Sequence, residues 1–216
     1  MAKPVWRGGI DLGSGRVTCV VGRVTDHEVE VVAADVQPSG GLNGGGVVDI
    51  ESTAQAITRA VEAAEEKADQ EIESFSIGIR GAHIESFNQQ GAVSIARTDK
   101  EITEEDVAHV KESAKAVRLS PDREILHLIP QGFTVDKQTG VVNPVEMEGH
   151  HLQVDAHIVT ASSTALNNIL KALSRASVEP DSMICGVLAA GEVVLDRNER
   201  DLGVVLIDIG GQTIDI

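Results

Sequence analysis

Short apolar runs separated by turns predict that the chain begins with a meander of three β-strands over residues 5–36. The two turns are expected at residues 13–15 and 25–27. The third run, residues 28–36, alternates apolar and polar positions at first and then becomes continuously apolar. Residues 40–46 hold five glycines among seven positions, so we interpret them as a flexible connecting loop.

Apolar residues that recur every three or four positions predict four helices, over residues 50–68, 103–117, 162–176 and 187–195. Asp49 is placed to cap the first helix at its N-terminus. Thr103 and Asp106 resemble a capping box at the start of the second helix, with Asp in place of the usual Glu.

The segment from about residue 81 to residue 159 differs in character from what surrounds it, because strand-like runs enclose a single helix there. The strands expected inside it span residues 83–87, 92–96, 124–129, 132–135, 141–147 and 152–159. Outside it we expect strands at 74–79, 183–185 and 204–209, with a charged turn at 198–201. The pattern predicts a mixed α/β layer interrupted by a small α+β insert.

Composition narrows the class of protein. Hydrophobic residues make up 42% and charged residues 24% of the 216 positions, as in an ordinary globular protein, and only 2% are aromatic, so the core must be aliphatic. A net charge of −16 without any run of Lys or Arg argues against nucleic acid as a partner. Cys19 and Cys185 lie in apolar runs without a partner motif and are interpreted as buried free thiols of a reducing cytoplasm.

Candidate chemistry begins at the first turn. Asp11 ends the first predicted strand, and the turn that follows offers Gly13, Ser14 and Gly15. A turn of this composition lets backbone N–H groups approach a phosphate, and Asp11 can then hold a hydrated Mg²⁺ beside it. Because Asp-x-Gly hairpin turns are common, a purely structural turn is the alternative interpretation.

A second copy of this device lies near the other end of the chain. The apolar run that begins at residue 204 ends at Asp208, and Gly210, Gly211, Gln212 and Thr213 follow it. Two copies of a strand, an aspartate and a glycine-rich turn predict two related half-domains that face each other across a phosphate.

These motifs resemble the actin/sugar-kinase/DnaK ATPase superfamily, and within it the FtsA family of bacterial actin-like cell division proteins. Residues 10–14 are similar to the first phosphate motif of the superfamily and residues 208–213 to the second. Residues 126–131 and 140–144 resemble the insert that distinguishes FtsA, the subdomain called 1C.

The resemblance implies an α/β fold: an actin-like, ribonuclease-H-like core with an inserted α+β subdomain and a second half-domain that is only begun. Subdomain 1A would comprise residues 1–80 and 160–200, subdomain 1C residues 81–159, and the start of a truncated subdomain 2A residues 201–216. Gln212 departs from the family's usual Gly-Gly-Gly-Thr run, where it is expected to crowd the phosphate turn.

The resemblance also implies a function. FtsA binds ATP with Mg²⁺, so Asp11 and Asp208 would lie on opposite sides of the metal, mostly with water between. FtsA forms actin-like filaments, recruits other divisome proteins through subdomain 1C, and tethers FtsZ to the cytoplasmic face of the inner membrane at the division site through a C-terminal helix absent from this chain. Asn167 and Asn168 stand where relatives place a water-orienting Glu or Gln, so hydrolysis should be slow or absent.

Two other functions remain open. One is a PilM-like pilus-assembly scaffold, which has a similar core and insert. The other is a sugar or acetate kinase, for which Asp136 and Asp155 are the candidate acceptor-activating acids, although surface acids on strands are the preferred interpretation of both. The pair His150 and His151 lacks a third ligand at metal-site spacing, and structural or solvated histidines are the preferred interpretation.

Overall fold

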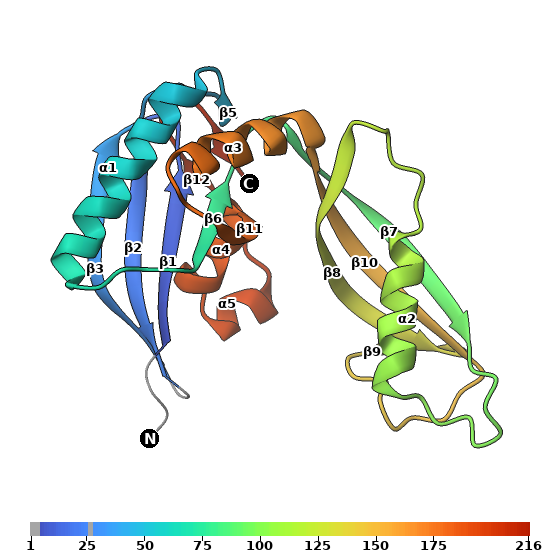
Figure 1. Ribbon diagram of the computed structural model, residues 1–216. Coiled ribbons are helices and arrows are strands. Elements are labelled where there is room, and N and C mark those ends of the chain that lie inside the picture. The colour runs from blue at the N-terminus through green and yellow to red at the C-terminus, as the bar shows by residue number, and fades with distance from the viewer. Residues whose placement is uncertain (1–4, 26–27) are drawn as a thin grey trace. The chain divides into compact units, whose positions relative to one another are not determined.

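The computed structural model describes residues 5–25 and 28–216 of the chain, and its contacts divide into two compact units. The first unit holds Met1–Ile84 together with Ser163–Ile216, and the second is Glu85–Ser162 (Figure 1). The second unit is thus inserted into the first, and each is described by itself below.

A five-stranded sheet of order β11-β6-β1-β2-β3 forms the centre of the first unit. Its strands are β1 (Val5–Leu12), β2 (Arg16–Val24), β3 (Val29–Pro38), β6 (Phe75–Ile79) and β11 (Pro180–Cys185). The first three strands are antiparallel neighbours, which confirms the meander, while β6 and β11 run parallel to β1. The predicted turn at 25–27 includes residues outside the described part of the chain.

Two helices, α1 (Ile50–Ala68) and α3 (Ser163–Arg175), pack against each other, and α1 lies on β2 and β3 (Figure 1). Asp49 caps α1 as predicted, because its Oδ1 accepts a hydrogen bond from the Ser52 N–H at 3.1 Å. Alternate residues of β2, among them Val17 and Val21, are fully buried. The intervening residues therefore point to the opposite face of the sheet.

Shorter elements complete the first unit: β4 (Leu42–Asn43), β5 (Gly46–Val47), α4 (Gly186–Val194), α5 (Arg197–Leu202), β12 (Asp208–Ile209) and β13 (Ile214–Asp215). The strands β4 and β5 form a small hairpin inside the glycine-rich loop. The prediction of a charged turn at 198–201 was wrong, because Asp196 and Glu199 form a capping box that starts helix α5. Of the strand predicted at 204–209, only the last two residues join a ladder.

The second unit is a four-stranded sheet of order β7-β10-β8-β9, with helix α2 (Glu104–Lys115) packed against β10 and β8. Its strands are β7 (Ile84–Ser94), β8 (Arg123–Val135), β9 (Gln138–Val141) and β10 (His151–Ser162). The runs predicted as separate strands at 83–87 and 92–96 are one strand, and so are those at 124–129 and 132–135. An irregularity in register between β8 and β10 at Asp155 and Ala156 lets β8 continue.

The strand predicted at 141–147 was also wrong, since β9 ends at Val141. Pro144 has no N–H to give to a ladder, and the Asn143 side chain accepts a hydrogen bond from the Val145 N–H at 3.2 Å. These residues therefore favour a turn in spite of the apolar pattern.

The core of the second unit is almost entirely aliphatic, as the composition predicted, with Phe133 as an aromatic exception. Val110 and Ala114 of α2 are fully buried in one cluster with Leu152 and Val154 of β10. The start of α2 is fixed by the predicted capping box, in which the Thr103 N–H donates to Asp106 Oδ2 at 2.8 Å. Among the helices that the structure describes, none is both long and apolar enough to cross a membrane.

Candidate functional site

The two predicted phosphate turns form hairpins with the same strand register. In each hairpin the aspartate and the residue after it pair with the opposite strand in equivalent positions: Asp11 with Thr18 and Leu12 with Val17, then Asp208 with Asp215 and Ile209 with Ile214. Every residue of the second hairpin lies 197 positions after its counterpart, as 208 does after 11. The repeat seen in the sequence is therefore also a repeat in the structure.

The turns themselves are closed by the same backbone hydrogen bond. The Gly13 N–H donates to the Arg16 carbonyl at 3.1 Å, and the Gly210 N–H donates to the Thr213 carbonyl at 2.9 Å. A side chain added at Gly13 would approach the Arg16 carbonyl oxygen to 2.8 Å, so this tight turn requires glycine.

The two hairpins meet at a polar cavity of about 500 Å³. Eight of the nine predicted phosphate-binding residues line it, and Gln212 is the exception. A Cβ atom added at Gly211 would lie 3.5 Å from the Gly15 nitrogen, which shows how closely the turns approach. The fold thus brings together residues from opposite ends of the sequence.

Arg80 joins the two hairpins, and sequence reasoning missed it. One guanidinium nitrogen, Nη2, donates to Asp11 Oδ1 at 2.8 Å, and the other, Nη1, donates to Asp208 Oδ2 at 2.8 Å. The Arg80 side chain is 15% exposed, against 38% for Asp11 and 26% for Asp208. Burial opposes the charge of Arg80, but the two carboxylates outweigh it, and the pKa of Arg80 is raised.

The position of Arg80 follows from strand pairing. Strands β1 and β6 run parallel with Asp11 beside Gly78, and Arg80 comes two residues later on the same face. Phe75, Ile77 and Ile79 occupy the alternate positions of β6 and are buried. This alternation was visible in the sequence, but the pairing of β6 with β1 was not.

The glycine-rich loop, which we interpreted as a flexible connector, is tied to both hairpins. The Gly45 N–H donates to Ser14 Oγ at 3.0 Å, and the Gly44 N–H donates to Gln212 Oε1 at 2.8 Å. Gly45 has a φ of 80°, and a Cβ atom there would lie 2.0 Å from the Arg80 carbonyl oxygen. The loop therefore packs on the backbone of Arg80, and the side chain of Gln212 turns to the loop instead of the cavity.

The remaining candidates lie elsewhere. On α3, Asn167 is exposed and Asn168 is half-buried, and neither lines the cavity. Asp136 Oδ1 accepts the backbone N–H groups of His150 and His151, both at 2.9 Å, and these bonds lower the pKa of Asp136. Asp155 accepts a hydrogen bond from Gln90 at 2.6 Å. Both acids thus have partners within the second unit.

The polar groups that line the cavity are of the kinds that bind a phosphate chain and a hydrated cation. Arg80 takes one oxygen of each carboxylate, which leaves the other oxygen of Asp11 and of Asp208 for water-mediated contact. Hydroxyl groups come from Ser14 and Thr213, and the glycine turns keep bulky side chains out. Among the described residues, no cluster of three or more His, Cys, Asp or Glu exists that could bind a metal directly. The carboxylate oxygens that Arg80 leaves free and the hydroxyl groups of the cavity could contact a hydrated cation beside a phosphate.

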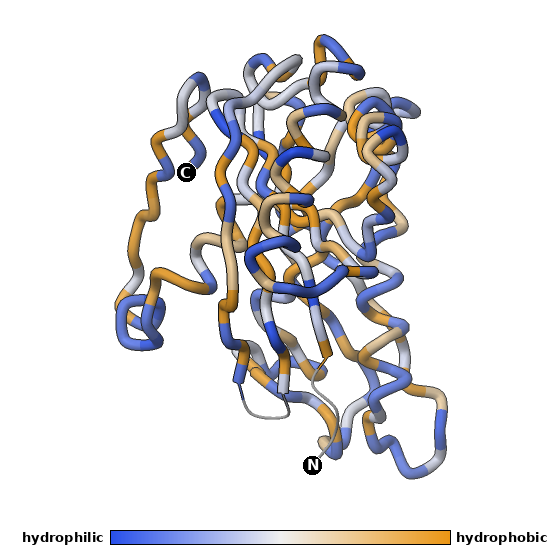
Figure 2. The backbone as a smooth tube through the Cα atoms, turned by 60° about the vertical axis from the view of Figure 1, so that its left-hand side comes forward, coloured by the Kyte–Doolittle hydropathy of each residue, from blue (hydrophilic) through white to orange (hydrophobic). Residues whose placement is uncertain are grey.

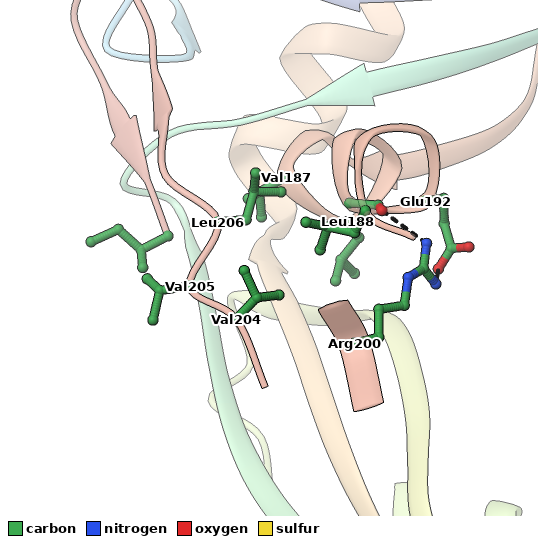
Figure 3. A pocket seen from close by; sticks show the side chains of 10 residues that line it. Val187, Leu188, Glu192, Arg200, Val204, Val205 and Leu206 are labelled. Carbon is green, nitrogen blue, oxygen red and sulfur yellow. Dashed lines mark hydrogen bonds and ion pairs between the residues drawn. The ribbon is translucent and has the colours of Figure 1, made fainter. Parts of the chain in front are cut away.

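A second cavity, of about 420 Å³, is apolar and has a different character (Figure 3). Val187 and Leu188 of α4 line it together with Leu206, while Arg200 donates to Glu192 Oε1 at 2.9 Å and to the Gly191 carbonyl at 2.8 Å. The apolar run that leads from α5 towards the C-terminus lies at the edge of the view in Figure 2. Val205 is 71% exposed there. This cavity offers little to bind phosphate.

The sheet order of the first unit, interrupted by a small α+β unit and carrying two equivalent hairpins at one polar cavity, defines a protein with an actin-like ATPase fold. A solved structure supports this fold. A chain of a PilM–PilN type IV pilus biogenesis complex matches 87% of this chain with a TM-score of 0.57 and 16% identity, over 49% of its own length. At that identity the likeness concerns the fold alone.

Sequence comparison identifies the family more narrowly. Residues 81–160 match the family described as the SHS2 domain inserted in FtsA. The cell division protein FtsA of Neisseria meningitidis is 41% identical over 208 residues, and that of Pseudomonas aeruginosa is 42% identical over 209. Each match covers 96% of this chain and 50% of the relative. The resemblance to FtsA is confirmed as a similarity along nearly the whole of this chain, which spans about half the length of the curated relatives it matches.

Proposed function

We propose that the chain carries the two phosphate-binding hairpins of an ATP-binding, actin-like cell division protein. The observation that carries the proposal is the equivalence of the two hairpins, which face one polar cavity with the same register and the same turn bond. A nucleoside triphosphate carries negative charge and phosphate oxygens, and paired glycine-rich turns can bind these oxygens through their backbone N–H groups.

In this proposal each hairpin contributes backbone N–H groups and one aspartate. The N–H groups near Gly13 to Gly15 and near Gly210 to Thr213 contact phosphate oxygens, while Asp11 and Asp208 hold Mg²⁺ mostly through water. When bound, the metal neutralises phosphate charge. Ser14 would also contact the phosphate, and its Oγ is held in position because it accepts a hydrogen bond from the Gly45 N–H.

Hydrolysis in this proposal is slow or absent. Asn167 and Asn168, the candidates to orient the attacking water, do not line the cavity, and an amide cannot act as a general base. ATP would then act mainly as a ligand that closes the protein around it, and the bound state would favour assembly.

The whole protein, in this proposal, works as FtsA does. It would polymerise into an actin-like filament, bind FtsZ, and hold FtsZ filaments at the cytoplasmic face of the inner membrane at the division site. Membrane contact would be made by a C-terminal helix of the whole protein. The similarity to proteins named cell division protein FtsA supports this role.

The second unit would supply contacts to neighbouring protomers and to other division proteins. It has its own buried core and an acidic helix face with Glu104, Glu105 and Glu112 exposed. We expect that deleting residues 82–158 from the whole protein preserves nucleotide binding and abolishes assembly. Sedimentation with ATP tests this, and intact filaments from the deletion variant would contradict it.

A phosphoryl-transfer assay separates this proposal from a kinase. A kinase consumes ATP only when an acceptor is present, whereas an assembly protein sediments with ATP alone. We expect ATP-dependent sedimentation of the whole protein, increased by FtsZ and by lipid vesicles. Consumption of ATP that requires an added sugar or acetate, without sedimentation, would contradict the proposal.

A further inference from the structure

Arg80 occupies the space between the two aspartates that the paired hairpins present to each other. Its two terminal nitrogens donate to different carboxylates, Asp11 Oδ1 and Asp208 Oδ2, each at 2.8 Å. The third nitrogen, Nε, is buried and has no hydrogen-bond partner in the part of the chain that is described. The side chain is therefore directed entirely at the two carboxylates.

The surroundings of Arg80 hold it in this position. Gly78 leaves room for the Asp11 carboxylate, because a Cβ atom at Gly78 would lie 3.3 Å from Asp11 Oδ1. On the other side, a Cβ atom at Gly186 would lie 3.3 Å from Arg80 Nη2. The backbone of Gly45 packs on the Arg80 carbonyl. The three glycines thus lie against three different groups: the Asp11 carboxylate, the Arg80 guanidinium and the Arg80 backbone.

A guanidinium that bridges two carboxylates relieves the repulsion between them, as a divalent cation at the same place would. Two carboxylates this close repel each other unless a cation lies between them. Arginine remains charged at any pH that the protein meets, and its planar fork can bond two acids at once. A hydrated Mg²⁺ placed between Asp11 and Asp208 would need the position that the Arg80 guanidinium already fills.

We propose that the Arg80 guanidinium serves as the cation that joins the two hairpins when no metal is bound, and that it competes with Mg²⁺ for Asp11 and Asp208. Divalent metal then binds between the acids only after Arg80 releases at least one of them. The protein gains a hairpin contact that persists without ligand, and it binds free Mg²⁺ more weakly than two unpaired aspartates would.

This inference rests on the proposed function only in treating the two aspartates as cation ligands. It is tested with the metal alone, so a chain that never binds ATP can still satisfy it. The measurement is the melting temperature of residues 1–216 as MgCl₂ is raised, with NaCl adjusted to keep the ionic strength constant. The variants are Arg80→Gln, Arg80→Lys and, as a control for loss of an ion-paired arginine, Arg23→Gln.

We expect the parent chain and Arg23→Gln to show little response to Mg²⁺, since Arg23 pairs with Glu30 away from the cavity. Arg80→Gln should melt at a lower temperature without metal and be stabilised by Mg²⁺, with an apparent affinity higher by on the order of tenfold. The response of Arg80→Lys to Mg²⁺ should be intermediate, because an ammonium group lacks the planar, two-pronged geometry with which a guanidinium donates to both acids. Adding Asp208→Asn to Arg80→Gln should abolish the response.

Equal responses of the parent chain and Arg80→Gln to Mg²⁺ would overturn the inference. If Arg80→Gln is unfolded without metal, refolding on addition of Mg²⁺ is the expected result. Failure to refold, together with an Arg80→Lys variant that responds like the parent chain, would overturn the inference as well.

Discussion

Gly45 is the position where a single methyl group should disturb the site most. Its φ is 80°, and a Cβ atom would lie 2.0 Å from the Arg80 carbonyl oxygen and 2.7 Å from the Gly81 Cα atom. Neighbouring Gly44 provides a matched control, because it has a φ of 54° and a Cβ atom there meets nothing within 4 Å. Gly45→Ala and Gly44→Ala therefore differ in the steric clash but share the cost of a left-handed residue.

The two costs can be separated in magnitude. An L-residue in the left-handed region costs about 1–2 kcal/mol, which is the whole expected effect of Gly44→Ala. Crowding a well-packed site adds about 1–3 kcal/mol, so Gly45→Ala should lose about 2–5 kcal/mol of unfolding free energy. The clash is with backbone atoms, which cannot rotate away as a flexible side chain would.

Urea unfolding of the two variants and of the parent chain measures both quantities. We expect Gly45→Ala to be destabilised by at least about 1 kcal/mol more than Gly44→Ala, with an unchanged dependence of free energy on urea concentration. Equal destabilisation of the two variants would mean that the loop does not pack on Arg80, and would refute the reasoning.

Two further predictions concern the chain as a whole and its second unit. We expect residues 1–216 alone to bind ATP weakly or not at all, because they span about half the length of the FtsA relatives; micromolar binding by isothermal titration would contradict this. Burial raises the pKa of Asp106, but hydrogen bonds from Arg97 and Thr103 outweigh it and lower the pKa to about 2. A depressed pKa stabilises the fold above the unfolded value of 3.8, so about 1–2 kcal/mol should be lost as the pH falls from about 4 to 2. Asp106→Asn should flatten this part of the pH profile in urea unfolding, and an unchanged pH profile in this variant would contradict the assignment.

Much of the fold could be predicted from local pattern. The meander, the helices α1, α2 and α3, and the caps at Asp49 and Thr103 all follow from periodicity and from side chains that bond their own backbone. The errors arose where local apolarity and tertiary pairing differ, as at residues 142–147 and 204–207. There the apolar residues have no ladder to join in the described part of the chain.

The candidate site was predictable only in part. The repeated Asp and Gly pattern identified both hairpins, because a turn of that composition has few other uses when it occurs twice. Arg80 and the loop at Gly44 and Gly45 were missed, since their roles depend on which strands lie side by side. A parallel pairing between residues so far apart in the chain leaves no local signal.

The central claim is that Asp11 and Asp208 belong to one cradle for nucleotide phosphates, and Asp208→Ala tests it most directly. The control is Asp215→Ala, which removes the carboxylate of the residue that pairs with Asp208 on the same hairpin and keeps the backbone pairing. Isothermal titration of Mg-ATP into the whole protein should show a loss of about 2–4 kcal/mol for Asp208→Ala and little change for Asp215→Ala. The melting temperature of Asp208→Ala should fall little, because Arg80 keeps its bond to Asp11. Unchanged Mg-ATP affinity in Asp208→Ala would contradict the account.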